Sequence, residues 1–183
     1  MVAQSNQPVA LIIGAGDAIG SAISEKFAEN GHVVCMARRN SDKLAPLVEQ
    51  LASRGLAAHA FSCDARDEQQ IVNLFTNIEQ DIGEIDVVVF NVGANVPMSI
   101  LDTSVRKFTK IWEMACFAGF LTGREAAKTM LPRNRGTIIF TGATASMRGG
   151  ANFGAFASAK HGLRALAQSM ARELGPKNIH VAH

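Results

Sequence analysis

Short apolar runs alternate with segments of helical periodicity along almost the whole chain. The apolar runs are VALII at 9–13, HVVCMA at 32–37, AAHAFS at 57–62, DVVVF at 86–90, GTIIFTG at 136–142 and IHVA at 179–182. Runs this continuous favour strands that are covered on both faces, because a half-exposed strand alternates apolar with polar residues. The helical patterns between the runs cover 18–30, 41–53, 67–81, 103–130 and 155–174.

This alternation predicts an α/β fold, namely a Rossmann-like doubly wound parallel sheet of about six strands with helices on both faces in a three-layer sandwich. No repeat, low-complexity tract or linker interrupts the pattern. The length of 183 residues and the apolar content of 48% are enough for one hydrophobic core. We therefore interpret residues 1–183 as a single domain.

The helical segment 103–130 carries two apolar stripes. One consists of Phe108, Trp112, Ala115, Gly119 and Gly123, and the other of Ile111, Met114, Ala118 and Leu121. One stripe can face the sheet while the other faces a partner, or both can be buried within one monomer. The later helix at 155–174 is rich in Ala and Gly, which permits a close approach between helices.

Composition and charge narrow the class of protein. The net charge of +2 is small and the basic residues are dispersed, which gives no support for nucleic-acid binding. The first residues show neither a basic segment nor a long apolar run, so we expect a cytoplasmic protein without a membrane partner. Cys35, Cys63 and Cys116 form no paired motif, and the five histidines show no convincing metal-ligand spacing, so we expect free thiols and no metal site.

A glycine-rich turn follows the first apolar run. In GAGDAIG, Gly14, Gly16 and Gly20 stand where the predicted strand passes into the predicted helix. Glycines there let backbone amides and the positive helix end approach a pyrophosphate without side chains in the way. Tight packing alone can also demand glycine, but the place of the turn after the first strand of an alternating pattern favours a dinucleotide.

The end of the second run, MARRN, indicates which dinucleotide binds. An acidic residue there would bond the ribose 2′-hydroxyl, whereas arginine would pair with a 2′-phosphate. Arg38 and Arg39 therefore favour NADP(H) over NAD(H), unless they only form a solvated strand end. Asp17 in the glycine turn would repel the 2′-phosphate unless an arginine neutralises it.

Several motifs, taken together, resemble the short-chain dehydrogenase/reductase family over essentially the whole chain. IIGAGDAIG is similar to the family's TGxxxGxG loop, with Ile13 for the Thr and Ala18 for the middle Gly. CDARD resembles the segment whose aspartate, here Asp64, holds the adenine amino group, and FNVG resembles NNAG, with Asn91 and Gly93 retained. ELGPKNIHV is similar to the approach to the family's sixth strand.

The resemblance implies an NAD(P)-binding domain. Its implied cofactor contacts are Gly14, Gly16, Asp17, Ala18, Ile19, Gly20, Arg38, Arg39, Asp64, Ala65, Asn91, Val92, Gly93, Thr141 and Lys160. It also implies a substrate lid and a last strand that would lie beyond residue 183. We expect this chain either to lack that cover or to be part of a longer product.

The resemblance breaks down at the catalytic positions. In the family a Ser, a Tyr and a Lys act with a helix Asn, and the Tyr exchanges the proton with the substrate. Here Phe156 stands at the Tyr position, Ala143 at the Ser position and Cys116 at the Asn position, while Lys160 is kept four residues after Phe156. The chain contains no tyrosine, so no displaced phenol can substitute. A subset of the family resembles this chain in carrying Phe for the Tyr.

Nearby side chains offer weak replacements for the missing groups. Thr141, Thr144 and Ser146 carry hydroxyls near the empty Ser position, but an alkyl alcohol is a much weaker acid than a phenol. Lys160 would then have to donate a proton directly or through water. Cys116, on an apolar helix, is better interpreted as a small core residue than as a nucleophile.

Two functions remain open. The first is an NADP(H)-binding oxidoreductase of small carbonyl or alcohol substrates with an altered proton path. The second is a dinucleotide-binding protein without catalysis, such as a redox sensor or a regulatory partner subunit. The resemblance also implies a homodimer or homotetramer, because the family commonly pairs the two helices that correspond to 103–130 and 155–174.

Overall fold

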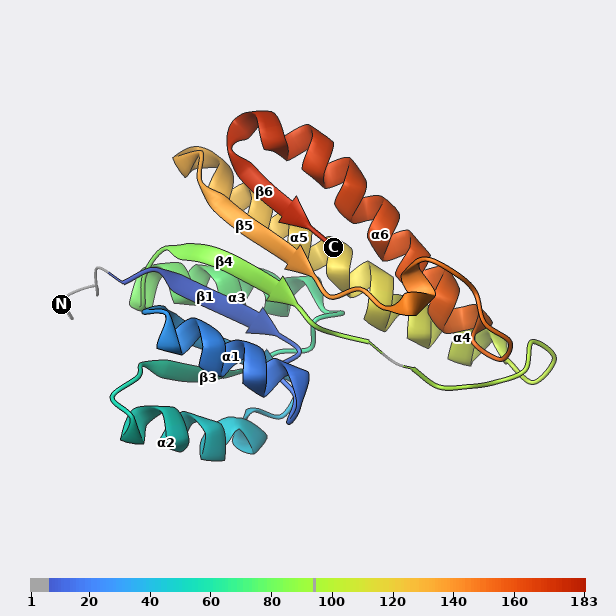
Figure 1. Ribbon diagram of the computed structural model, residues 1–183, viewed down its shortest axis with the longest axis horizontal. Coiled ribbons are helices and arrows are strands. Elements are labelled where there is room, and N and C mark those ends of the chain that lie inside the picture. Colours follow the sequence, from blue (N-terminus) through green and yellow to red (C-terminus); the bar gives the residue numbers. More distant parts are fainter. Residues whose placement is uncertain (1–6, 94) are drawn as a thin grey trace.

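The computed structural model describes residues 7–93 and 95–183, so the predicted domain limit at residue 1 lies outside the described residues. Its centre is a parallel sheet of six strands in the order β3-β2-β1-β4-β5-β6 (Figure 1). The strands are β1 (Val9–Ile13), β2 (Val33–Arg38), β3 (Ala58–Ser62), β4 (Ile85–Phe90), β5 (Gly136–Phe140) and β6 (Ile179–Ala182). This confirms the predicted doubly wound α/β fold. The order of the strands reverses direction between β1 and β4, which is where such sheets bind ligands at the carboxyl ends.

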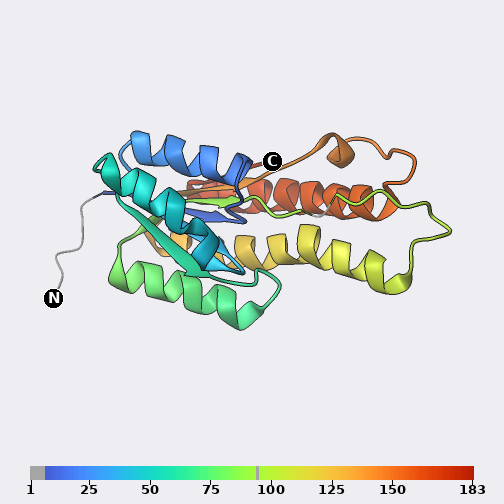
Figure 2. The same ribbon diagram turned by 90° about the horizontal axis from the view of Figure 1, so that it is seen from below.

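Helices cover both faces of the sheet. They are α1 (Ile19–Glu29), α2 (Ala45–Ser53), α3 (Glu68–Asp81), α4 (Val105–Trp112), α5 (Ala118–Met130) and α6 (Gly154–Leu174). Figure 2 shows α1 and α2 on one side of the sheet and α3 and α5 on the other. Successive residues of β1 alternate between the two cores, since Leu11 packs with the α3, α5 and α6 side and Ile12 with the α1 and α2 side. The continuous apolar runs therefore arise from burial on both faces.

The edge strand β3 departs from this pattern. The sequence predicts that all six strands are covered on both faces, but His59, Ala60 and Ser62 are exposed. The cause is the position of the strand, because β3 has a neighbour on one side only and helices cover it incompletely. The prediction of full coverage was wrong for β3.

The helix predicted at 103–130 is broken by a π-helical segment, Glu113–Phe117, which separates α4 from α5. A π turn adds a residue and so shifts the phase of every later side chain. Phe108 and Trp112 are about two-fifths exposed, whereas Gly119 and Gly123, predicted on the same stripe, are buried. A Cβ at Gly119 would lie 2.4 Å from the Leu163 side chain. The predicted stripe therefore does not form one continuous face.

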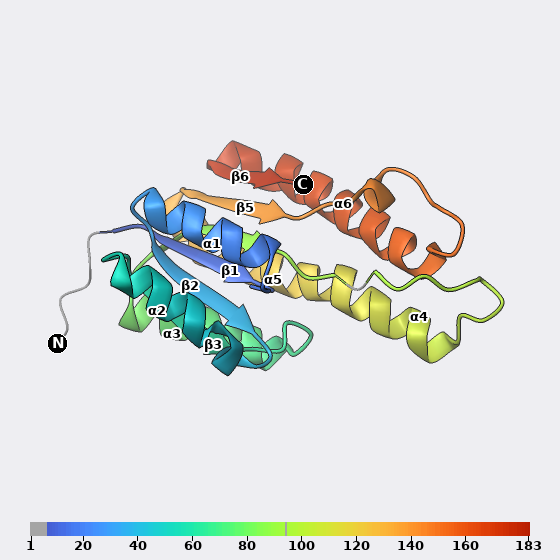
Figure 3. The same cartoon turned by 60° about the horizontal axis from the view of Figure 1, so that its bottom comes forward.

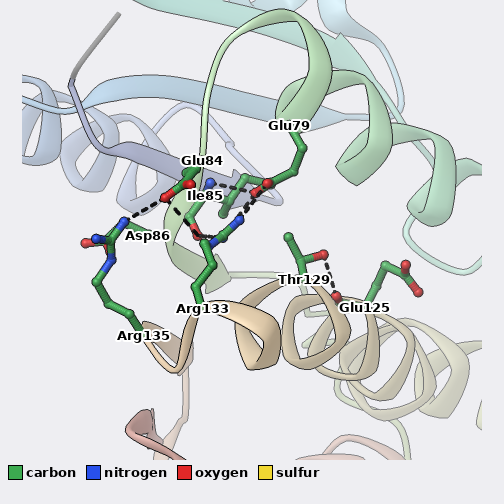
Figure 4. Close-up of polar contacts among 8 residues, drawn as sticks. All are labelled: Glu79, Glu84, Ile85, Asp86, Glu125, Thr129, Arg133 and Arg135. Carbon is green, nitrogen blue, oxygen red and sulfur yellow. Dashed lines mark hydrogen bonds and ion pairs between the residues drawn. The ribbon is translucent and has the colours of Figure 1, made fainter. Parts of the chain in front are cut away.

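Ion pairs fix the amino ends of β4 and β5, at the end of the sheet away from the cavity described below (Figure 4). The Arg133 guanidinium donates to Glu79 at 2.6 Å and to the Ile85 carbonyl at 2.9 Å. Arg135 donates to Glu84 at 2.9 Å and to Asp86 at 3.1 Å. Because Arg133 and Glu79 are mostly buried, this pair is screened less than the exposed Arg135 contacts. The pairs tie the strands together without involving the opposite, carboxyl end.

Three cysteines, Cys35, Cys63 and Cys116, are free and buried. Burial raises the pKa of the Cys35 thiol to about 12 and that of Cys63 to about 11. Both thiols are therefore protonated at neutral pH. Among the described residues no helix has the length and apolar character needed to cross a membrane.

Candidate cofactor and active site

The turn from β1 to α1 depends on glycine for two different reasons. Gly14 has a φ of +86°, and a Cβ there would lie 2.6 Å from the Asn91 carbonyl oxygen. Gly20 allows the start of α1 to approach Ala15, whose Cα would lie 2.6 Å from an added Cβ. By contrast, a Cβ at Gly16 would meet nothing within 4 Å. Gly14 and Gly20 therefore serve the fold, while the space in front of Gly16 is open to a ligand.

A cavity of about 540 Å³ lies at the carboxyl ends of β1, β2 and β4. Figure 3 shows that the loops following these strands lie at the same edge of the sheet. The cavity is lined by Ile13, Gly14, Ala15, Gly16, Ala37, Arg38, Arg39, Asn40, Lys43, Cys63, Asp64, Ala65, Arg66, Asn91, Val92, Gly93 and Met114. The structure thus brings together nine of the predicted cofactor contacts: Gly14, Gly16, Arg38, Arg39, Asp64, Ala65, Asn91, Val92 and Gly93. A parallel sheet delivers them to one place because all its carboxyl ends lie at one edge.

The other predicted contacts lie around this cavity rather than in its lining. Ala18 and Ile19 form the exposed start of α1, and Gly20 is buried beneath it. Thr141 follows β5, and its amide donates to the Phe90 carbonyl at 2.9 Å. Asp17 is 84% exposed and projects from the glycine turn toward Arg38.

Arg38 and Asp17 form an ion pair at the mouth of the cavity. Nη1 of Arg38 donates to Oδ1 of Asp17 at 2.8 Å. The repulsion expected from Asp17 is therefore neutralised by an arginine of the chain itself. Arg39 and Lys43 line the same end of the cavity and add two further cations. This end has a net positive charge even with the carboxylate included.

Asp64 and Arg66 form a second ion pair further along the cavity. Nε and Nη2 of Arg66 donate to Oδ1 and Oδ2 of Asp64 at 2.9 and 2.5 Å. The backbone amide of Arg66 donates to Oδ1 as well, at 3.1 Å. The Arg66 side-chain hydrogen bond holds the pKa of Asp64 below its usual range, so the carboxylate is ionised at neutral pH.

Asn91 joins the ends of β1 and β4. Its side-chain amide donates to the Gly14 carbonyl at 3.1 Å, and its backbone amide donates to the Ile13 carbonyl at 2.8 Å. Asn91 thereby fixes the glycine turn against the next strand. Two residues later the chain passes beside α6, since a Cβ at Gly93 would lie 3.7 Å from both Lys160 Cε and Phe156 Cε2. The loop after β4 therefore connects the cavity to the predicted catalytic positions.

Lys160 is held in place by backbone carbonyls. Its side chain is almost fully buried, and the ammonium Nζ donates to the Thr141 carbonyl at 2.9 Å and to the Val92 carbonyl at 3.3 Å. Burial lowers the pKa of Lys160 to about 8. The ammonium lies 6.0 Å from the centre of the Phe156 ring. Lys160 is thus close to Phe156 but is engaged by the strand ends.

Phe156 and Ala143 belong to one apolar cluster. Phe156 is 8% exposed and packs with Ile111 and Ala155, and Met98, Ala143 and Ala145 pack against this cluster. The nearby Ser146 hydroxyl accepts from the Ala143 amide at 3.1 Å and is fully buried. The predicted Tyr and Ser positions therefore offer methyl and phenyl groups where proton transfer would require hydroxyls.

A second cavity of about 330 Å³ lies beside Phe156. It is lined by Asn95, Ala143, Thr144, Ala145, Arg148, Gly149, Gly150, Phe153 and Phe156. It lies between the loops that follow β4 and β5. Most of these groups are apolar or backbone, so the cavity suits a largely apolar small molecule.

Cys116 lies within the π-helical segment, beside α6. It packs with Ala115 and Ala159, and its Sγ would lie 3.0 Å from a Cβ at Gly162. Burial raises the pKa of its thiol despite the neighbouring Lys160 charge. These surroundings fit the interpretation of Cys116 as a core residue.

Eight residues that line the first cavity are not among the predicted contacts: Ile13, Ala15, Ala37, Asn40, Lys43, Cys63, Arg66 and Met114. Asn40 and Lys43 arrive there because a 3-10 turn, Ser41–Leu44, follows β2 directly, and the Asn40 side chain caps that turn. The run of Asn, Ser and Asp at 40–42 is a turn signal that could have suggested this. Met114 lines the cavity from the π-helical segment, which no pattern in the sequence indicates.

Both the sequence and the structure of this chain resemble those of known proteins. Residues 8–183 match the sequence model of the short chain dehydrogenases. A crystal structure of a short-chain dehydrogenase from Rhodopseudomonas palustris is 55% identical, with a TM-score of 0.93, and the match covers 96% of this chain and 82% of that one.

Two curated relatives are more distant. A short-chain dehydrogenase/reductase of Armillaria gallica is 30% identical over 94% of this chain and 67% of its own length. The (21S)-21-acetoxyl-apo-melianone synthase of Melia azedarach is 31% identical over 94% and 64%, respectively. The chain therefore spans about two thirds of the length of these curated relatives.

Proposed function

Because the chain belongs to the short-chain dehydrogenase/reductase family, an oxidoreductase family that binds NAD(P), we propose that it binds NADP(H) in preference to NAD(H). We further propose that it acts on small carbonyl or alcohol substrates with a degenerate catalytic tetrad and low turnover. The observation that carries the proposal is the cavity along β1, β2 and β4, with its open glycine turn and its cationic end.

The chain's own groups fit each part of a dinucleotide. A Cβ at Gly16 would meet nothing within 4 Å, so the backbone at the start of α1 is open to a pyrophosphate. Asn91 and Lys160 hold the loop after β4, and the Lys160 ammonium is a donor for the ribose hydroxyls beside the nicotinamide. When bound, the nicotinamide supplies the hydride chemistry of the reaction.

The preference for NADP(H) rests on charge at the end of β2. Arg38, Arg39 and Lys43 line that end of the cavity, and Arg38 neutralises the neighbouring carboxylate of Asp17. A 2′-phosphate would add charge-assisted hydrogen bonds with these cations. For NAD(H), the ribose 2′-hydroxyl would need an acceptor at this place, but β2 ends at Arg38 and is followed by Arg39 rather than by an acidic residue.

Isothermal titration of the purified chain with NADPH and with NADH tests this proposal. We expect NADPH to bind at least about tenfold more tightly, which corresponds to roughly 1.4 kcal/mol. Titration with 2′,5′-ADP and with 5′-AMP isolates the phosphate from the nicotinamide. Equal affinity for the two dinucleotides, or tighter binding of NADH, would contradict the preference.

A dinucleotide-binding protein without catalysis is the alternative function. The apolar cluster of Phe156, Ala143 and Met98 favours it, because these side chains can neither donate nor accept a proton. Lys160 has a pKa of about 8, but two of its three ammonium protons are donated to carbonyls, so that it could supply a proton only through the third or through water. Turnover assays with ketones distinguish the two functions.

We propose that the chain forms a homodimer, or a homotetramer built from it. Phe108 and Trp112 of α4 and Phe120 of α5 are each about two-fifths exposed, and large aromatic residues of this kind are enriched in interfaces. Figure 1 shows α4 and the first turns of α6 extending beyond the sheet, where a second copy could pack against them. Light scattering at micromolar concentration should give a dimer, with Trp112→Ser weakening it. A monomer would contradict the proposal.

A further inference from the structure

The pair formed by Asp64 and Arg66 changes what the far end of the cofactor cavity can recognise. By resemblance, Asp64 would accept a hydrogen bond from the adenine amino group. In the structure, Oδ1 of Asp64 accepts from the Arg66 backbone amide at 3.1 Å and from Nε at 2.9 Å. Oδ2 accepts from Nη2 at 2.5 Å. The carboxylate is therefore largely satisfied before any base arrives.

The remaining groups at this end of the cavity favour contact with the face of a base. Cys63, Ala65 and Arg66 follow β3 beside Asp64, and Met114 lines the same cavity. A guanidinium stacks well on a purine, and a thioether makes favourable contacts with aromatic rings. The bidentate pair with Asp64 also keeps the Arg66 side chain fixed, so that little rotamer entropy is lost when a base binds.

We propose that Arg66 is a base-binding residue of the cofactor site and that Asp64 is its positioning residue, so that the 6-amino group of adenine contributes little to affinity. The proposal rests on the proposed dinucleotide site. It gives the site a specificity that differs from the one expected by resemblance: the chain should accept a dinucleotide whose purine carries a 6-oxo group. A stacked guanidinium contacts the purine ring whatever its 6-substituent, whereas a carboxylate facing a 6-oxo group would be repulsive.

Deamino-NADPH, which carries hypoxanthine in place of adenine, is the probe. Isothermal titration of the wild-type chain should give dissociation constants for NADPH and deamino-NADPH within about threefold of each other. A hydrogen bond from the amino group to the Asp64 carboxylate would instead make NADPH at least about tenfold tighter. That larger ratio would overturn the proposal.

Two variants distinguish contact between Arg66 and the base from direct recognition of the adenine amino group by Asp64. Arg66→Ala should weaken NADPH binding about tenfold and, because it releases the carboxylate, should make the site prefer NADPH over deamino-NADPH. Asp64→Ala should weaken both cofactors by the same factor, since it only frees Arg66 to move. If Asp64 reads the amino group directly, Asp64→Ala would weaken NADPH alone and Arg66→Ala would strengthen it.

Arg54→Ala is the matched control. Arg54 forms a comparable ion pair, with Nη2 at 2.5 Å from Glu29 Oε1, but it lines neither cavity. Its removal should leave both dissociation constants unchanged. A wild-type chain that binds neither NADPH nor NADH would contradict the proposed function itself, whereas one that binds NADPH and rejects deamino-NADPH would contradict only the role of Arg66. The ratio of the two constants is independent of the fraction of folded protein, so a partly unfolded variant still gives a decisive result.

Discussion

The two sides of the site differ in the polar and charged groups that they present. On the side of β1, β2 and β3, the glycine turn, the arginines after β2 and the pair of Asp64 with Arg66 present donors and charge to an open cavity. On the side of β5 and α6, Phe156 and Ala143 belong to an apolar cluster, and Lys160 is the one residue of the family's catalytic Ser, Tyr, Lys and Asn that is retained. Under the proposed function, this difference means that cofactor binding and proton transfer depend on separate groups of this fold.

The reason lies in the kind of group each task requires. Pyrophosphate binding uses backbone amides, which need only a glycine such as Gly16 to expose them. Proton transfer needs a hydroxyl of suitable pKa at one place, and a single substitution removes it. Lys160 belongs to both sides, because its carbonyl bonds tie β5 to the loop after β4.

Restoring the hydroxyls should produce the largest effect. We expect Phe156→Tyr combined with Ala143→Ser to raise the rate of carbonyl reduction by about 10² to 10⁴, the usual contribution of a placed acid. The measurement is NADPH oxidation with a panel of small ketones and quinones. Phe153→Tyr, which adds a phenol to the same cavity at another position, is the control and should give no increase. No gain in the double variant would show that these positions are not the ones that limit the reaction.

Substituting the glycine turn should have the next largest effect. Gly16→Val should weaken NADPH and NADH alike, by about 2 kcal/mol or more, because its side chain would enter the pyrophosphate space. Since an added Cβ at Gly16 meets no neighbour within 4 Å, thermal stability should barely change. Gly14→Val should also weaken both cofactors, but it should unfold at lower temperature, because Gly14 has a φ of +86° and contacts Asn91. Unchanged affinity in Gly16→Val would place the pyrophosphate elsewhere.

Changing the charge after β2 should affect one cofactor only. Arg38→Ala should cost NADPH about 1 to 3 kcal/mol of binding free energy and leave NADH nearly unchanged. Asp17→Asn should strengthen NADPH binding, because it releases Arg38 from its 2.8 Å ion pair and removes a negative charge near the 2′-phosphate. Isothermal titration with both cofactors measures each change. An equal loss for NADPH and NADH in Arg38→Ala would remove Arg38 from the specificity of the site.

Removing Lys160 should have the smallest effect on binding. Lys160→Met should cost about 1 kcal/mol of NADPH affinity, because a buried donor is lost. It should also change the dependence of stability on pH. The folded-state pKa of Lys160 is about 8, below its ordinary 10.5, so the unfolded chain binds more protons between these values. Burial of the charged form destabilises the wild-type chain below pH 8.

The free energy of unfolding of wild type should therefore rise relative to Lys160→Met as the pH increases from 8 toward 10.5. Urea unfolding at several pH values measures the difference. The same pH dependence in both proteins would show that Lys160 does not titrate in this range.

The sequence predicted the fold well because local signals and topology agree. The apolar run VALII predicts a strand, and the glycine at position 14 predicts a turn directly after it. The structure has both at these positions. The π-helical segment at Glu113–Phe117 could not be predicted, since one additional residue per turn leaves the apolar composition of the helix unchanged. Its phase shift is why Gly119 is buried when Phe108 is exposed.

The site was predicted in part for a related reason. Arg38 and Asp17 are 21 residues apart, but the turn after β1 and the end of β2 must be neighbours in a parallel sheet, so their pairing could be anticipated. The pairing of Asp64 with Arg66 could not, because residues two apart meet only in a particular loop conformation. The same holds for the apolar packing of Ala143 against Phe156, which depends on the path of the loop after β5.

The central claim is that this chain binds NADPH but transfers its hydride slowly, and one measurement tests it directly. The chain is saturated with NADPH, binding is followed by nicotinamide fluorescence, and the complex is then mixed with a panel of ketones and quinones. We expect a fluorescence change that saturates at micromolar NADPH, followed by oxidation several orders of magnitude slower than in the Phe156→Tyr, Ala143→Ser variant. Rapid oxidation by the unmodified chain would contradict the account, because it would show that another group donates the proton.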